Sequence, residues 1–177
     1  MKILVLVLLA MLVLSEAKGG GWKPVNKKSE IRFNSTESTI EVKTELQLDS
    51  TDVRHLVIEF CSTECNGEHF QRIEIDYTRR PRRAGNAILD FTIKHQGTIE
   101  QDSYTQMTFG ELVWTFNVIS PSIIHVQCNQ ATCDNNISAE NLHKIDRFRF
   151  GSGDTASLYY RVYSTDNGSD ILPGENC

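Results

Sequence analysis

Four arginines surround one proline in the stretch DYTRRPRRAGNAI, where they are Arg79, Arg80, Arg82 and Arg83. RPRR followed by Ala84 matches the R-x-[KR]-R pattern after which secretory-pathway convertases cut. The four guanidinium groups could instead bind a sulfated glycan, a phosphate or an acidic protein surface through paired hydrogen bonds. A hairpin tip kept soluble by its charge would explain the same residues without a ligand. The arginines are therefore the candidate ligand-binding residues, with all three interpretations open.

Other chemistry-bearing groups form no familiar motif. The sequence has no G-x-S-x-G elbow, no H-E-x-x-H zinc helix and no glycine-rich phosphate loop. The histidines lie far apart in the chain and without metal-ligand spacing, at His55, His69, His95, His125 and His143. We therefore expect no catalytic residues, no metal, no cofactor and no enzymatic activity.

The cysteines indicate disulfides. They are Cys61, Cys65, Cys128, Cys133 and Cys177. In an exported chain the C-x3-C and C-x4-C pairs favour two short bridges over zinc ligation, Cys61 to Cys65 and Cys128 to Cys133. A crossed pairing of the two segments remains open. Cys177 is the odd one, which leaves a free thiol or an interchain bridge that makes a homodimer.

The chain begins with a secretory signal. Lys2 precedes an apolar run from Ile3 to Leu14, and the small residues Ser15 and Ala17 suit a signal peptidase. The run is shorter than the roughly 20 residues that span a bilayer. We expect a secreted, extracellular protein with no membrane span. Its formal net charge of -5 gives no reason to expect a nucleic-acid partner. Three sequons predict glycosylation at Asn34, Asn136 and Asn167.

Period-two alternation predicts the elements that must position these groups. It is clearest in Thr39 to Asp49, Gln71 to Tyr77, Ala87 to Lys94 and Glu111 to Val118. Weaker strands are expected at Glu30 to Phe33, Arg54 to Phe60, Ser122 to Cys128, Ile145 to Phe150 and Ser157 to Tyr163. Only Ser138 to Lys144 suggests a short helix. About nine short strands predict a single all-β domain, an antiparallel β-sandwich or jelly-roll-like fold.

The predicted layout has four parts. They are a signal peptide (1–17), a flexible N-terminal arm (18–29), the disulfide-stapled β-sandwich (30–165) and a C-terminal tail (166–177). Trp114 and Phe116 share the apolar face of their strand and are expected in the core. Trp22 lies in the arm, where we expect it to hold the arm against the sandwich.

The order of short strand motifs resembles a family of extracellular β-sandwich domains named farnesoic acid O-methyltransferase-like. The matching segments are IEV at 40–42, IEID at 73–76, NAI at 86–88, VWTF at 113–116, IHV at 124–126 and FRFG at 148–151 with Tyr160. The family's double glycine after the second motif is replaced here by the arginine-rich loop. The resemblance implies a secreted recognition module, and the chain has no glycine-rich loop to hold a methyl donor.

Together these patterns predict a secreted, non-enzymatic binding module for an extracellular glycan, an anionic ligand or a protein, in innate defence or the extracellular matrix. One alternative is a precursor or toxin-like effector processed after Arg83. Another is a small secreted hydrolase, which would require histidine and acidic side chains to meet in the fold.

Overall fold

The computed structural model describes residues 21–27, 29–34, 38–44, 53–62, 71–82, 86–108, 111–130, 132–153 and 157–164. Several predictions fall outside these residues. They concern the signal peptide, the C-terminal tail, Cys65, His69, Arg83, Asn167 and Cys177.

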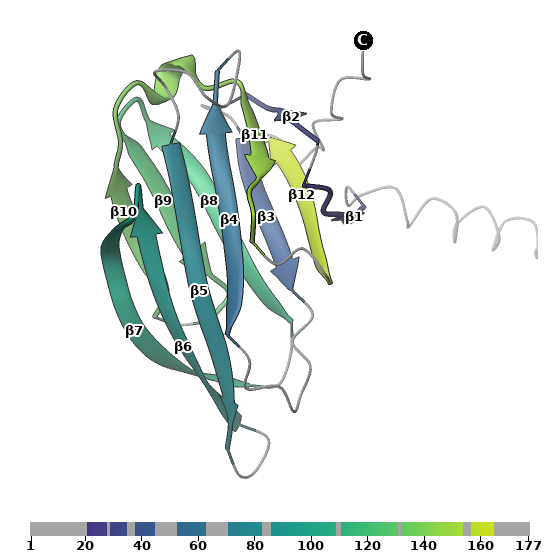
Figure 1. The fold of residues 1–177 in the computed structure, drawn as a ribbon, viewed down its shortest axis with the longest axis vertical. Coiled ribbons are helices and arrows are strands. Elements are labelled where there is room, and N and C mark those ends of the chain that lie inside the picture. The colour runs from purple at the N-terminus through teal and green to yellow at the C-terminus, as the bar shows by residue number, and fades with distance from the viewer. Residues whose placement is uncertain are drawn as a thin grey trace, which may run out of the picture.

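Two antiparallel six-stranded sheets pack into a sandwich, which confirms the predicted fold class. Sheet A has the order β1-β12-β3-β8-β9-β10, and sheet B has the order β2-β11-β4-β5-β6-β7. Sheet B lies in front of sheet A in Figure 1. The strands of sheet A are β1 (Lys23–Pro24), β12 (Leu158–Ser164), β3 (Ser38–Thr44), β8 (Leu112–Ser120), β9 (Ile123–Cys128) and β10 (Asp134–Ser138). Those of sheet B are β2 (Ile31–Arg32), β11 (Arg147–Phe150), β4 (Arg54–Cys61), β5 (Gln71–Pro81), β6 (Asn86–His95) and β7 (Thr98–Thr108).

Alternate side chains of each strand fill the space between the sheets. In β5, Ile73, Ile75 and Tyr77 are buried, while the residues between them are half-buried on the outer face. Trp114 of sheet A is fully buried and contacts Tyr77 and Phe91 of sheet B, with ring centroids 6.1 and 5.8 Å apart. The predicted core position of Trp114 is confirmed, and its ring joins the two sheets.

Three strands were not predicted: β1, which lies in the arm that was expected to be flexible, β7 and β10. β7 reads TIEQDSYTQMT, in which polar side chains occupy both faces, because it is the edge strand of sheet B. β10 is the edge strand of sheet A and reads DNNIS. The helix expected from Ser138 is wrong: Ser138 ends β10, and only Leu142–Lys144 forms a single 3-10 turn.

The arginine-rich segment is also placed differently from the prediction. β5 continues through Pro81, so that Arg79 and Arg80 belong to the strand and not to the hairpin tip. Their backbones pair with Leu89 and Ile88 of β6. Arg79 points inward and Arg80 outward, because alternate positions of β5 face opposite sides of the sheet.

Trp22 holds the N-terminal arm to sheet A, as predicted. Its ring lies between two cations, with Lys43 Nζ 5.0 Å and Arg161 Cζ 4.7 Å from the ring centroid. Such contacts are worth about 0.5–1 kcal/mol at exposed sites. The adjoining strand β1 pairs with Tyr159 and Tyr160 of β12.

Candidate functional site

The four arginines do not form one binding site. Arg79 points to the inner side of β5 and is only 2% exposed, so it cannot be part of a solvent-facing patch. Arg80 lies on the outer face, where its Nη2 donates to Asp90 Oδ1 at 2.6 Å. Arg82 lines a surface hollow at the end of the sheet, and Arg83 lies outside the described residues. Cleavage after Arg83 stays a prediction.

A different set of groups meets on the outer face of sheet B, and we call it the His55 cluster. It consists of His55 on β4, Arg72, Glu74 and Asp76 on β5, and Lys94 on β6. Glu74 and Asp76 are two residues apart on one strand and therefore point to the same side. His55 is the direct cross-strand neighbour of Asp76, and Lys94 is that of Glu74.

The His55 ring lies between two carboxylates. Its Nδ1 contacts the Asp76 carboxylate, and its Nε2 lies 3.7 Å from Glu74 Oε2. Lys94 Nζ donates to the other Asp76 oxygen at 2.7 Å, and Arg72 Nε lies 2.8 Å from Glu74 Oε1. A histidine held by a carboxylate through one ring nitrogen has a fixed orientation for proton transfer at the other.

Electrostatics keep Asp76 ionised. Burial raises the pKa of the Asp76 carboxyl, but the hydrogen bonds and charges of Lys94 and His55 outweigh that effect and hold the pKa below its usual range. The same contact raises the pKa of Lys94. Asp76 is therefore suited to orienting His55, because a carboxylate that stays ionised accepts hydrogen bonds and donates none.

Residues of β4, β11 and the segment after β11 surround the His55 cluster. Glu59 is buried and lies 3.5 Å from Arg72 Nη1, and it also accepts from Arg149 of β11. The chain leaving β11 then passes along β4. Gly151 N donates to Val57 O at 3.0 Å, and a Cβ on Gly153 would lie only 2.3 Å from the carbonyl oxygen of His55. The backbone that carries His55 is thus closely covered.

This site was not predicted from the sequence. Its signals were the E-x-D spacing of Glu74 and Asp76, which predicts one shared face, and a histidine in a neighbouring strand. The register that sets His55 opposite Asp76 is a property of the folded sheet. Among the described histidines, His125 is set apart in sheet A, where its Nε2 lies 2.6 Å from Asp134 Oδ1.

The free energy of unfolding is expected to decrease as the pH falls, because of His95. Its Nε2 lies 2.8 Å from Gln71 Oε1, and burial lowers its pKa while Glu100 partly offsets that effect. The unfolded chain therefore binds this proton more readily. The stability is fully present above the unfolded pKa of about 6.5 and is lost as the pH falls through the lower folded value. Urea unfolding should show a flatter pH dependence below about pH 6.5 for His95→Gln than for the wild type. An unchanged slope in His95→Gln would contradict the assignment, and the exposed residue His143 supplies the control, His143→Gln.

The disulfide prediction is confirmed for one bridge. Cys128 and Cys133 are bonded, with their Cα atoms 5.2 Å apart, which excludes the crossed pairing. Cys61 is also disulfide-bonded, but Cys65 lies outside the described residues, so the Cys61–Cys65 bridge stays a prediction. Asn34 and Asn136 are exposed, and glycosylation there stays a prediction.

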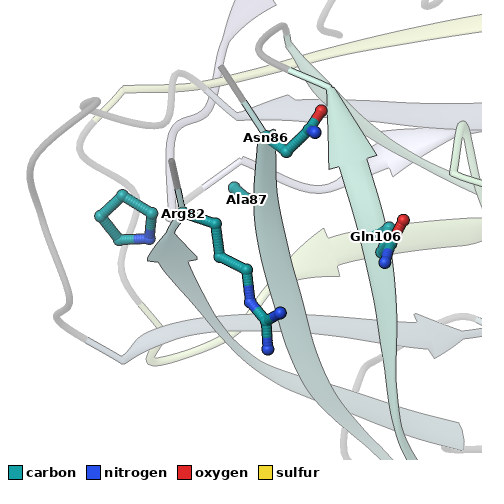
Figure 2. A pocket seen from close by; sticks show the side chains of 5 residues that line it. Arg82, Asn86, Ala87 and Gln106 are labelled. Carbon is teal, nitrogen blue, oxygen red and sulfur yellow. The ribbon is translucent and has the colours of Figure 1, made fainter. Parts of the chain in front are cut away.

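The same outer face of sheet B ends in an open hollow of about 710 Å³. Figure 2 shows Arg82, Asn86, Ala87 and Gln106 around it, and Pro81 completes the lining.

In the part of the chain that the structure describes, no group of three or more His, Cys, Asp or Glu side chains is arranged to hold a metal ion. Over the same residues no helix has the length and apolar composition needed to cross a membrane.

Comparison with known proteins finds enzymes among the similar folds. No family model and no curated sequence matches the chain, and the resemblance described above stays a prediction. An alginate lyase from Pseudomonas aeruginosa matches at 10% identity and a TM-score of 0.40, over 83% of this chain and 62% of that one. Porphyranase B from Zobellia galactanivorans matches at 10% identity and a TM-score of 0.31, over 82% and 57%. The chain spans less than two thirds of either structure's length.

These matches contradict the prediction of a non-enzymatic binding module, because both proteins are enzymes by name. We withdraw that prediction and the expectation of no enzymatic activity. The hydrolase alternative required histidine and acidic side chains to meet, and the His55 cluster meets that requirement. The likeness assigns neither substrate nor residues to this chain, so the His55 cluster itself must carry the functional argument.

Proposed function

We propose that the chain is a polysaccharide-cleaving enzyme whose proton-transfer residue is His55. The observation that supports this proposal is the position of the His55 ring between Asp76 and Glu74 on the outer face of sheet B. Asp76 is the positioning residue that holds the ring. Glu74 provides a carboxyl group beside His55, and hydrolysis of a glycosidic bond requires one group that protonates the leaving oxygen and another that activates water.

An extended polar ligand suits the shape and chemistry of this face. Enclosed pockets bury most of a small ligand, whereas the His55 cluster is spread over three strands of an open sheet. Ammonium, guanidinium, imidazole and carboxylate groups alternate across these strands, so both donors and acceptors face a ligand rich in hydroxyl groups. The signal-like segment at residues 1–17 supports an extracellular setting for such a substrate.

Cleavage of a polysaccharide panel tests the proposal. Neutral, carboxylated and sulfated polysaccharides are incubated with the purified protein, and new reducing ends are counted. Ultraviolet absorbance of unsaturated ends distinguishes elimination from hydrolysis. We expect His55→Ala to lower the rate about 100-fold, a loss typical of one acid–base group.

His125→Ala is the matched control, because it removes a histidine of another His–Asp pair on sheet A. It should leave the rate unchanged. Equal rates for wild type, His55→Ala and His125→Ala would refute the assignment of His55, and failure to cleave any member of the panel would refute the function.

A further inference from the structure

We infer that the far end of the outer face of sheet B holds a subsite for an anionic sugar unit, a carboxylated or sulfated residue of the same glycan. We call it the Tyr104 subsite. It comprises Arg82, Asn86 and Gln106, which line the hollow, and Tyr104, which is exposed two residues before Gln106 on β7. It deepens the proposed function and rests on it, because the sugar bound here belongs to the chain that His55 cleaves.

Strand register places the subsite on the same face as the His55 cluster. Side chains of β5 that point outward continue from Asp76 through Thr78 and Arg80 toward Arg82, whose backbone N–H donates to Asn86 O at 2.8 Å. Ile88 of β6 pairs with both Arg80 and Gln106, so all three share one side of the sheet. Arg82 lies six positions after Asp76, which is about 20 Å along an extended chain.

Arg82 provides the charge at this end. Its neighbours are committed elsewhere, since Arg79 is buried under the sheet and Arg80 is bound to Asp90. No carboxylate pairs with the Arg82 guanidinium among the described residues, and its side chain borders the hollow in Figure 2. A guanidinium group binds a carboxylate or a sulfate through two parallel hydrogen bonds.

An aromatic ring and two amides are the other groups of the Tyr104 subsite. Tyr104 is 69% exposed and lies directly across from Asp90 on β7. A single exposed apolar side chain is ordinary. Here the ring lies two residues from Gln106 on the same side of β7, where its apolar face can pack against the C–H face of a pyranose and its hydroxyl can bond. Asn86 and Gln106 present amides that donate to and accept from sugar hydroxyls.

The hollow is also of suitable size. Its volume of about 710 Å³ lies within the range of about 300–1,000 Å³ found for small-ligand sites. Its openness along the sheet allows the neighbouring sugars to continue toward His55. Screening by salt weakens a contact between exposed charges, so binding through Arg82 should weaken as ionic strength rises.

Binding measured apart from cleavage tests the inference. Isothermal titration calorimetry uses the full chain carrying His55→Ala, with oligogalacturonate, a heparin-derived oligosaccharide and a neutral cello-oligosaccharide of equal length. Added to this background, Arg82→Gln should weaken binding of an anionic oligosaccharide about 10-fold, the loss of a charged hydrogen bond. It should leave neutral binding unchanged, whereas Tyr104→Ala should weaken both. The two anionic probes distinguish a carboxylate from a sulfate.

Arg32→Gln is the charge-matched control, since Arg32 is an exposed arginine on β2 at the other side of sheet B. Equal affinities for the Arg82→Gln and Arg32→Gln variants would overturn the subsite. If wild type cleaves polysaccharide but Arg82→Gln binds normally, the subsite fails and the proposed function stands. If wild type cleaves nothing while Arg82→Gln binds anionic sugar more weakly, the proposed function fails and the anion contact stands.

Discussion

Replacing Trp114 by alanine is expected to lower the free energy of unfolding by about 3–5 kcal/mol, the range for large aromatic residues in cores. The side chain is 0% exposed and contacts rings from the opposite sheet, Tyr77 and Phe91. Alanine would leave a cavity between the sheets at that point. Urea unfolding measures the change, with an unchanged m-value showing that the folded state stays compact.

Trp114→Phe separates packing from hydrogen bonding. The indole N–H of Trp114 is buried and has no acceptor among the described residues, so its removal breaks no such bond. Phenylalanine keeps an aromatic ring in the space between Tyr77 and Phe91. Its loss of stability should therefore be clearly smaller than that of alanine, and equal losses would show that the ring contacts do not stabilise the sandwich.

Gly153→Ala is expected to destabilise the fold by about 1–3 kcal/mol, as overpacking of a dense site does. The new Cβ would lie 2.3 Å from the His55 carbonyl oxygen and 3.1 Å from Val57 N. Those atoms are backbone, so β4 or the loop must move. Movement of β4 displaces the His55 ring, and small errors of position can lower a rate 100-fold. We therefore expect a joint loss of stability and polysaccharide cleavage.

Gly21→Ala is the control for this substitution. A Cβ on Gly21 would meet no atom within 4 Å, so stability and cleavage should both be unchanged. Thermal unfolding and the reducing-end assay give the two readouts. Wild-type stability and rate in Gly153→Ala would mean that the loop after β11 does not constrain His55.

Strand positions were predictable where one face of the strand is buried and the other faces solvent. Period-two alternation in Gln71 to Tyr77 and Ala87 to Lys94 located β5 and β6, because one side of each is covered by sheet A. It failed for β7, whose edge position removes the need for an apolar face. It also failed at Arg79, where a charged residue continues the inward positions of β5 and the sequence reads as a loop.

The candidate site was less predictable than the fold. Alternation alone sets Glu74 and Asp76 on one face, but His55 is joined to them only by the pairing of β4 with β5. A shift of one residue in that register would turn His55 toward a different side of the sheet. Long-range pairing of this kind depends on the packing of the whole sandwich, and no local motif records it.

β5 carries both ends of the proposed binding surface, with Asp76 near its middle and Pro81 beside the hollow at its end. Hydrogen bonds to β4 and β6 on its two sides make this strand stiff. A stiff strand keeps a fixed distance between the His55 cluster and the hollow. If a charged sugar is held beside Arg82 while the bond near His55 breaks, the fragments released should have one preferred number of sugar units, and single sugars should be rare among the products.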